Sequence, residues 1–225
     1  MTLAGQVWLD KIGLLRSIIL WIFQESEEME LFKCGGEIPV LESERLRLRR
    51  MEREDGPALH KFWSDPEVVR YMNIPPFASI EDTHQMIDLL NGLAESEDAM
   101  RWAIELKETG QVIGSCGFNT WELAGAFRGE IGYDLGQEFW GSGYMSETLR
   151  MVIRYGYETM GLNRIEGLVD PRNEASRKLL AALGFQEEGL LREYQKTEEG
   201  FVDLIMCSLL KKDYDRRLNS GAAEV

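Results

Sequence analysis

The chain has 225 residues, a formal net charge of −14 and three cysteines. This length suits one domain of about 175 residues plus an extension, and the acidic balance without a basic patch disfavours direct binding of nucleic acid. Cys34, Cys116 and Cys207 lack the spacing of metal ligands, which argues against a zinc site or a disulfide framework and fits the reducing cytoplasm.

Residues 1–40 are predicted to form an amphipathic N-terminal extension and a linker. The uninterrupted apolar run at 17–23 is far shorter than the ~20 residues of a membrane span. Acidic residues at 25–28 follow it and disfavour an anionic lipid surface. We therefore expect a helix that packs on the domain or on a second copy in a homodimer, with attachment to a membrane surface as the alternative. Residues 33–40 resemble a linker.

The next elements alternate between strand and helix patterns. A first strand is predicted at 44–51, and helices at 53–64 and 80–96. A hairpin-like pair of strands follows at 100–107 and 111–119, because Glu108-Thr-Gly110 is a turn signal. The two histidines, His60 and His84, fall in the predicted helices, so we expect no histidine-rich metal site.

The segment 127–147 is the most informative part of the chain. A strand at 127–135 leads into the turn Gly141-Ser142-Gly143, and a helix follows at 144–159. Glycines let the backbone approach a ligand, and the start of a helix favours an anion, so the pattern predicts a phosphate cradle. Its helix carries an apolar stripe at Met145, Leu149, Val152, Ile153, Gly156 and Met160.

Three familiar sites do not match this turn. A P-loop needs Lys and then Ser or Thr where Ser142 and Gly143 stand. A dinucleotide fingerprint needs a third glycine where Ser146 stands, and a nucleophile elbow needs glycines where Trp140 and Tyr144 stand. The turn therefore does not indicate NTP hydrolysis, dinucleotide binding or serine hydrolysis.

A second strand–turn–helix unit follows directly. A buried strand is predicted at 164–169 and a helix at 173–183, for which Asp170 or Asn173 is a suitable cap. Two more strands are predicted near 185–192 and 202–210. Antiparallel strands followed by strands with interleaved helices predict an α+β fold with a mixed, largely antiparallel sheet.

These motifs, in this order, resemble the GCN-related N-acetyltransferase (GNAT) superfamily over residues 41–215. The openings at 41–50 and 64–72, and the ending at 189–210, are similar to the RimJ/RimL-type branch, the ribosomal-protein N-terminal acetyltransferases. The resemblance implies a splayed sheet flanked by helices, with acetyl-CoA as co-substrate and no metal. It implies that acetyl-CoA contacts Phe139, Trp140, Gly141, Ser142, Gly143, Tyr144, Met145 and Asn173.

Two residues depart from the family pattern. Glu138 stands where Gln or Arg usually opens the phosphate loop, so backbone N–H groups would carry more of the binding. Leu180 stands where many members place a tyrosine acid. Ser176 matches the serine of RimL-type enzymes and is therefore the candidate that protonates the CoA thiolate.

Glu130 is the candidate general base, because RimJ/RimL-type enzymes often carry Glu at that position. Strand alternation places Glu130 and Asp134 on one face, which makes Asp134 the second choice. The structural alternative is an ion pair of Glu130 with Arg101 or Arg128.

The resemblance implies direct transfer of acetyl to a primary amine, with the N-terminal α-amine of a ribosomal protein as the leading acceptor. The alternatives are a small-molecule amine (a polyamine or an antibiotic) and a non-catalytic module that binds acyl-CoA. The expected organisation is an extension at 1–40, the acetyltransferase domain at 41–215 and a tail at 216–225.

Overall fold

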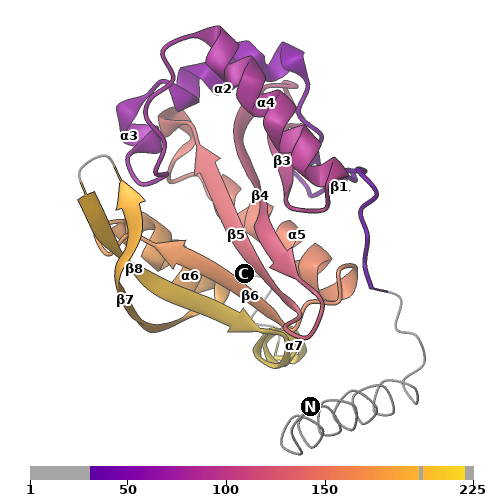
Figure 1. Ribbon diagram of the computed structural model, residues 1–225. Helices are drawn as coiled ribbons and strands as arrows, with labels where there is room; N and C mark the ends of the chain where they lie inside the picture. The colour runs from indigo at the N-terminus through magenta and orange to yellow at the C-terminus, as the bar shows by residue number, and fades with distance from the viewer. Residues whose placement is uncertain (1–30, 198–199, 221–225) are drawn as a thin grey trace, which may run out of the picture. The chain divides into compact units, whose positions relative to one another are not determined.

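Over residues 31–197 and 200–220, which a computed structural model describes, eight strands form one sheet in the order β1-β2-β3-β4-β5-β6-β8-β7 (Figure 1). All neighbouring pairs are antiparallel except β5 and β6, which are parallel. The α+β fold with a mixed, largely antiparallel sheet is thereby confirmed. The strands are β1 (Leu41–Glu42), β2 (Leu46–Arg49), β3 (Met100–Leu106), β4 (Val112–Glu122), β5 (Arg128–Leu135), β6 (Arg164–Val169), β7 (Gln186–Thr197) and β8 (Gly200–Leu210).

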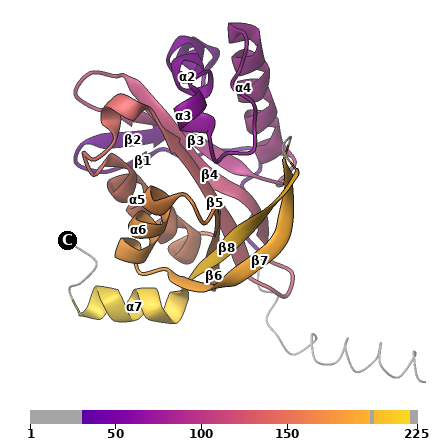
Figure 2. The same ribbon diagram turned by 90° about the vertical axis from the view of Figure 1, so that its left-hand side faces the viewer.

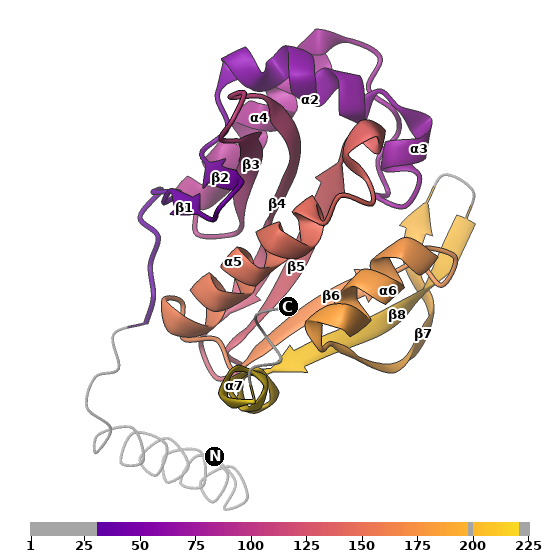
Figure 3. The same cartoon turned by 180° about the vertical axis from the view of Figure 1, so that it is seen from behind.

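Helices cover both faces of this sheet. Helices α2, α3 and α4 lie together along one face, and α5 lies on the other face with α6 beside it (Figures 2 and 3). The helices are α2 (Gly56–Trp63), α3 (Pro66–Val69), α4 (Ile80–Glu95), α5 (Tyr144–Glu158), α6 (Glu174–Leu183) and α7 (Lys211–Asn219), with 3-10 turns η1 (Arg53–Asp55) and η2 (Gln137–Phe139). Sequence patterns predicted α2, α4, α5 and α6 and missed the short α3 and the polar α7.

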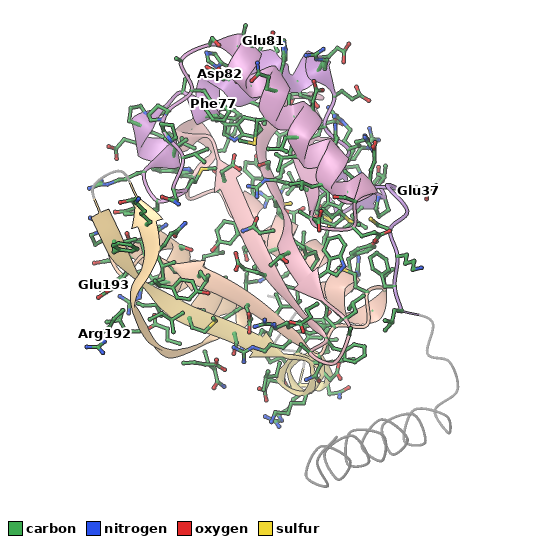
Figure 4. The ribbon with its side chains drawn as sticks, in the orientation of Figure 1. Glu37, Phe77, Glu81, Asp82, Arg192 and Glu193 are labelled. Carbon is green, nitrogen blue, oxygen red and sulfur yellow. The ribbon has the colours of Figure 1, made fainter. Side chains whose placement is uncertain are left out.

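Local signals explain where two of these helices begin. Ser79 Oγ accepts from Asp82 N at 3.3 Å, and Asp82 Oδ2 accepts from Ser79 N at 2.9 Å, which is a reciprocal capping box at the start of α4. Figure 4 labels Asp82 at that end of the helix. Asn173 Oδ1 accepts from Ser176 N at 3.0 Å, so Asn173 caps α6 as the sequence predicted.

The buried residues form two clusters, one on each face of the sheet. The predicted stripe of α5 is buried against the larger cluster, which contains Trp102, Phe118 and Ile131. The smaller cluster packs α2 and α4 on the opposite face and contains Leu59, Phe62, Trp63 and Ile87. The sheet is therefore packed on both faces, which fixes the positions of the side chains that β5 and β6 carry.

The segment 33–40 packs on this domain. Cys34 and Ile38 are buried in the larger cluster, and Trp102 Nε1 donates to Pro39 O at 2.7 Å. The backbone N–H of Cys34 also donates to Glu97 at 3.0 Å. The described chain thus contacts the domain before residue 41, where sequence reasoning placed the boundary. The predicted helix before residue 31 and the end of the tail lie outside the described residues. No described helix is long and apolar enough to cross a membrane.

The hairpin of β7 and β8 forms one end of the sheet, with β7 as the edge strand. Its ladder shifts register between Leu191 and Gln195, which leaves Arg192, Glu193 and Tyr194 in a bulge. Glu193 has a left-handed φ of 49°, and Asp203 accepts a bond from its N–H at 2.7 Å. Figure 4 shows Arg192 and Glu193 at the outer side of β7, directed away from the sheet.

Candidate functional site

The parallel strands β5 and β6 separate after a short ladder. Only three residue pairs join them, ending at Glu130 and Glu166, and the strands diverge beyond that point (Figure 1). From Ile131 onward, the β5 edge that faces β6 has no ladder partner within the described residues. Backbone N–H groups on such an edge are available to an oxygen atom of a ligand.

Two cavities open along this separation. One, of about 570 Å³, is lined by Glu130, Arg101 and Asn119 together with apolar side chains of α3, α4 and β8. The other, of about 660 Å³, lies toward the start of α5. The two share a set of lining residues and therefore adjoin: Val68, Tyr71, Tyr133, Asn173 and Ser176.

The residues predicted to contact acetyl-CoA lie mostly in the second cavity. Its lining includes Phe139, Trp140, Gly141, Gly143, Tyr144, Met145 and Asn173. Ser142 is the exception: it is not among the lining residues, and its carbonyl accepts from Arg45 Nη1 at 3.1 Å. The structure therefore brings seven of these eight residues together around one cavity.

The glycine loop owes its shape to two left-handed residues. Gly141 has φ 71° and Gly143 has φ 78°, and Gly143 is the N-cap of α5 without a side-chain capping bond. Only glycine adopts such a φ without steric cost. Because no side chain caps the helix, the N–H groups of the first turn are left for a ligand, and the helix dipole favours an anionic one.

Arg45 adds a positive charge beside this loop, which sequence reasoning missed. Its guanidinium pairs with Glu147 at 2.6 Å and lies 4.5 Å from the centre of the Tyr144 ring. Arg45 therefore ties the strand β2 region to the first turn of α5. The signal was weak because Arg45 is one of several arginines in the segment 45–50.

Glu138, which stands where the family usually has Gln or Arg, is paired with a lysine. Lys61 of α2 donates to Glu138 Oε1, and this hydrogen bond lowers the pKa of Glu138. Glu138 therefore carries an ion-paired charge, which reduces its repulsion of a bound phosphate.

Glu130 lines the first cavity, on the sheet face that carries α2 and α4. Its Oε1 accepts from Asn119 Nδ2 at 3.1 Å. The expected alternative, an ion pair with Arg101 or Arg128, is not formed: Arg128 pairs with Glu122 and Glu166, and Arg101 pairs with Asp134. Glu130 is thus the carboxylate in this cavity without a cationic partner among the described residues.

Asp134, the second choice as base, is fully engaged. Its carboxylate accepts from Trp63 Nε1 at 3.1 Å, from Arg101 Nη2 at 2.7 Å and from Ser115 Oγ. The side chain is only 1% exposed. Asp134 is absent from the lining of the first cavity, and a carboxylate with both oxygens occupied is poorly placed to accept a proton from an amine.

Ser176 stands in the first turn of α6 and meets Tyr133 of β5. The two hydroxyl oxygens are 2.6 Å apart, and both residues line both cavities. Burial raises the pKa of Tyr133 to about 12, although the bond to Ser176 opposes the shift. Leu180, which replaces the tyrosine acid, is buried in the core. Sequence reasoning missed Tyr133; the strand alternation that grouped Glu130 with Asp134 places it on the opposite face, toward α6.

The described residues hold no cluster of three or more His, Cys, Asp or Glu side chains that could bind a metal ion. All three cysteines are free and buried. Burial raises the pKa of the Cys116 thiol and raises that of Cys207 to about 11. These thiols are therefore core residues rather than nucleophiles.

Comparison with known proteins gives concordant results. A family model described as "Acetyltransferase (GNAT) domain" matches residues 45–186. The uncharacterized N-acetyltransferase p20 of Bacillus licheniformis is 49% identical over 175 residues, which is 78% of this chain and 98% of that protein. The [ribosomal protein uS5]-alanine N-acetyltransferase of Escherichia coli is 29% identical over 129 residues, which is 57% of this chain and 66% of that protein.

A solved structure agrees at the level of the fold. Mycobacterium smegmatis RimJ in complex with CoA-disulfide superposes with a TM-score of 0.73. The match covers 83% of this chain and 97% of that chain, at 20% sequence identity.

Proposed function

The chain belongs to the acetyltransferase (GNAT) family, and from that premise we propose that it transfers an acetyl group from acetyl-CoA to a protein N-terminal α-amine. The observation that carries the proposal is the pair of adjoining cavities between β5 and β6. The glycine loop borders one cavity, and the Glu130 carboxylate borders the other. The two reacting molecules can therefore be held on opposite sides of the Tyr133–Ser176 pair.

The residues of the second cavity fit the co-substrate, which supplies an acetyl group activated as a thioester. The backbone of the loop at Gly141 and Gly143 would hold the pyrophosphate at the start of α5. Asn173 would hold the pantetheine arm, while its side chain also caps α6. Arg45 braces the loop by donating to the Ser142 carbonyl, and its own charge is paired with Glu147, so the backbone N–H groups of the loop would carry the phosphate binding.

The chain's residues divide the proton transfers between them. Glu130 accepts a proton from the amine, directly or through water, as the nitrogen bonds to the acetyl carbon. The unpaired backbone edge of β5 after Glu130 stabilises the oxyanion. The Ser176 hydroxyl gives its proton to the departing sulfur as the carbon–sulfur bond breaks. Because both molecules are held together, orientation supplies much of the rate.

Two considerations favour an α-amine as the acceptor. Its pKa of about 7.7–8.0, against about 10.4 for lysine, leaves part of it neutral near pH 7. The first cavity also offers one unpaired carboxylate, because Asp170 is bound by Arg172 at 2.7 and 2.9 Å. A polyamine has several cationic groups, and we would expect its site to offer more than one unpaired carboxylate. The name of the Escherichia coli relative supports a ribosomal protein with an N-terminal alanine as the partner, and a cytoplasmic reaction is part of the same proposal.

The test is a turnover screen coupled to binding. Acetyl-CoA consumption is measured with peptides that begin with alanine or serine, with spermidine and with kanamycin. We expect the peptides to be the fastest acceptors. Turnover with spermidine or kanamycin alone would contradict the α-amine assignment, and CoA binding without turnover on the whole panel would favour a non-catalytic module.

The loop is tested by calorimetry with CoA. Gly143→Asp adds bulk and negative charge where the pyrophosphate would lie, so CoA affinity should be lost. Gly161→Asp is the matched control, because Gly161 has a similar φ of 70°, open space around it and a position after the end of α5. Equal CoA affinity in the two variants would remove the loop from the binding site.

A further inference from the structure

A series of hydrogen-bonded side chains runs across the sheet face beneath the first cavity, from Asp134 through Arg101 and Asn119 to Glu130. We propose that Asn119 is a positioning residue that aims the Glu130 carboxylate at the acceptor amine, and that Asp134 anchors it through Arg101. This inference rests on the proposed function, in which Glu130 is the base.

At the Asp134 end of this series, the side chains are held by several hydrogen bonds. Arg101 donates through Nη2 to Asp134 at 2.7 Å and through Nε to Ser115 Oγ at 2.9 Å. Ser115 and Trp63 also bind Asp134, and the Asp134 and Arg101 side chains are 1% and 12% exposed. Because two of its nitrogens donate to these buried partners, the Arg101 guanidinium is held in place.

The orientation of the Asn119 amide follows from Arg101. A guanidinium only donates hydrogen bonds, so the amide must turn its oxygen toward Arg101. Arg101 Nη1 donates to Asn119 Oδ1 at 3.2 Å, and Asn119 Nδ2 then faces Glu130 and donates to Oε1 at 3.1 Å. The carboxylate therefore meets a donor at one oxygen, while its second oxygen has no hydrogen-bond partner among the described residues.

The backbone is also shaped to put Asn119 there. The β4–β5 ladder shifts register between Phe118 and Thr120, so Asn119 is the extra residue of a β-bulge beside Glu130. Bulges re-aim side chains and are common next to active sites. The amide lies over Gly132, where a Cβ would come within 2.4 Å of Asn119 Oδ1. Gly132 thus provides the space that the amide occupies.

The consequence is catalytic rather than structural. A glutamate side chain loses rotamer freedom when it is fixed, and a bond from a preset amide offsets part of that cost before the substrate arrives. Asn119 would therefore act on the proton-transfer step and leave the binding of acetyl-CoA unchanged.

The test is a double-mutant cycle on kcat with acetyl-CoA and the fastest acceptor of the panel above. Asn119→Ala should lower kcat about 10- to 100-fold with little change in the KM for either substrate, because it misplaces the base. Glu130→Gln should lower kcat further, and the double variant should be no slower than Glu130→Gln alone, because Asn119 then has nothing to position. Asn163→Ala, at an exposed site outside both cavities, is the control.

Gly132→Ala gives a second approach, since its Cβ displaces the amide without removing it; it should reproduce the kcat loss at a retained CoA affinity. Wild-type kcat in Asn119→Ala, or multiplicative losses in the cycle, would overturn the positioning role while Glu130 remained the base. Wild-type kcat in Glu130→Gln would instead overturn the base assignment, and with it the inference. Absence of turnover by the unmodified protein would contradict the proposed function itself.

Discussion

The Tyr133–Ser176 pair places two hydrogen-bonded hydroxyl groups in the cleft, where we propose that Ser176 is the proton donor that the buried Leu180 side chain does not supply. A pKa of about 12 keeps the Tyr133 hydroxyl protonated over the whole range in which the protein would be assayed. The tyrosine can therefore donate to Ser176 Oγ and leave the serine proton directed at the departing sulfur. Under the proposed function, Ser176 would act on the substrate and Tyr133 would act through Ser176.

This division of roles predicts unequal effects of two substitutions. Ser176→Ala should lower kcat by about 10²-fold or more, the usual range for a proton-transfer group, and Tyr133→Phe should have a smaller effect. CoA affinity should hold in both. Tyr155→Phe, a partly buried tyrosine outside both cavities, is the control. A larger loss in Tyr133→Phe than in Ser176→Ala, measured as single-turnover rates, would make the tyrosine the direct acid.

At the scale of elements, Gly92 near the end of α4 and Gly184 at the end of α6 should respond differently to alanine. Gly92 lies inside α4 with nothing within 4 Å of an added Cβ, whereas Gly184 ends α6 with φ 98° and would place a Cβ 2.9 Å from Arg217. The same substitution therefore meets a helical conformation in one case and a left-handed conformation with a close contact in the other.

Gly92→Ala should raise the free energy of unfolding by about 0.5–1 kcal/mol, because alanine favours the helix interior. Gly184→Ala should lower it by about 1–2 kcal/mol, because a left-handed alanine is strained. Urea unfolding of the two variants beside the unmodified protein measures both. Equal shifts of the same sign would contradict the helical conformation of Gly92 or the left-handed conformation of Gly184.

At the scale of the whole molecule, the chain has a net charge of −14, and several of its carboxylates are nonetheless held in ion pairs. The clearest lies across β6, β7 and β8, where Arg164 binds both oxygens of Glu188 at 2.6 and 2.8 Å. That pairing, with a bond from Ser208, lowers the pKa of Glu188 to about 2. Partners also lower the pKa values of Glu42, Glu138, Asp170 and Glu187.

These lowered pKa values predict acid sensitivity. The unfolded chain, with Glu near 4.3, binds protons before the folded chain does, so stability rises with pH across this range. The stabilisation should be complete above pH ~5 and lost as the pH falls toward about 2. Urea midpoints measured from pH 7 to pH 3 should fall, and Glu188→Gln should flatten the slope. Glu193→Gln, which removes a carboxylate without an ion pair among the described residues, should not; an equal slope in both variants would contradict the assignment.

The periodic elements followed from the sequence alone, because periodicity belongs to a single segment. The stripe of α5 and the Asn173 cap of α6 were confirmed, and the strands that became β3 to β6 were found within a few residues of their ends. The loop at Gly141 and Gly143 was also readable, since a left-handed φ next to a helix start requires glycine whatever surrounds it.

Only the tertiary structure decided which side chains of the cleft are hydrogen-bonded to one another. The bond between Tyr133 and Ser176 joins residues 43 positions apart, and the pairing of Lys61 with Glu138 joins residues 77 apart. The bulge that turns Asn119 toward Glu130 depends on the register of β4 against β5, and the anchoring of Asp134 depends on α2 packing over the sheet. Such contacts depend on how separate elements pack and on their register, and a pattern within one segment carries no information about either. The order of the elements could therefore be read along the chain, whereas the partners of its acids and hydroxyls were set by which elements lie side by side in the folded sheet.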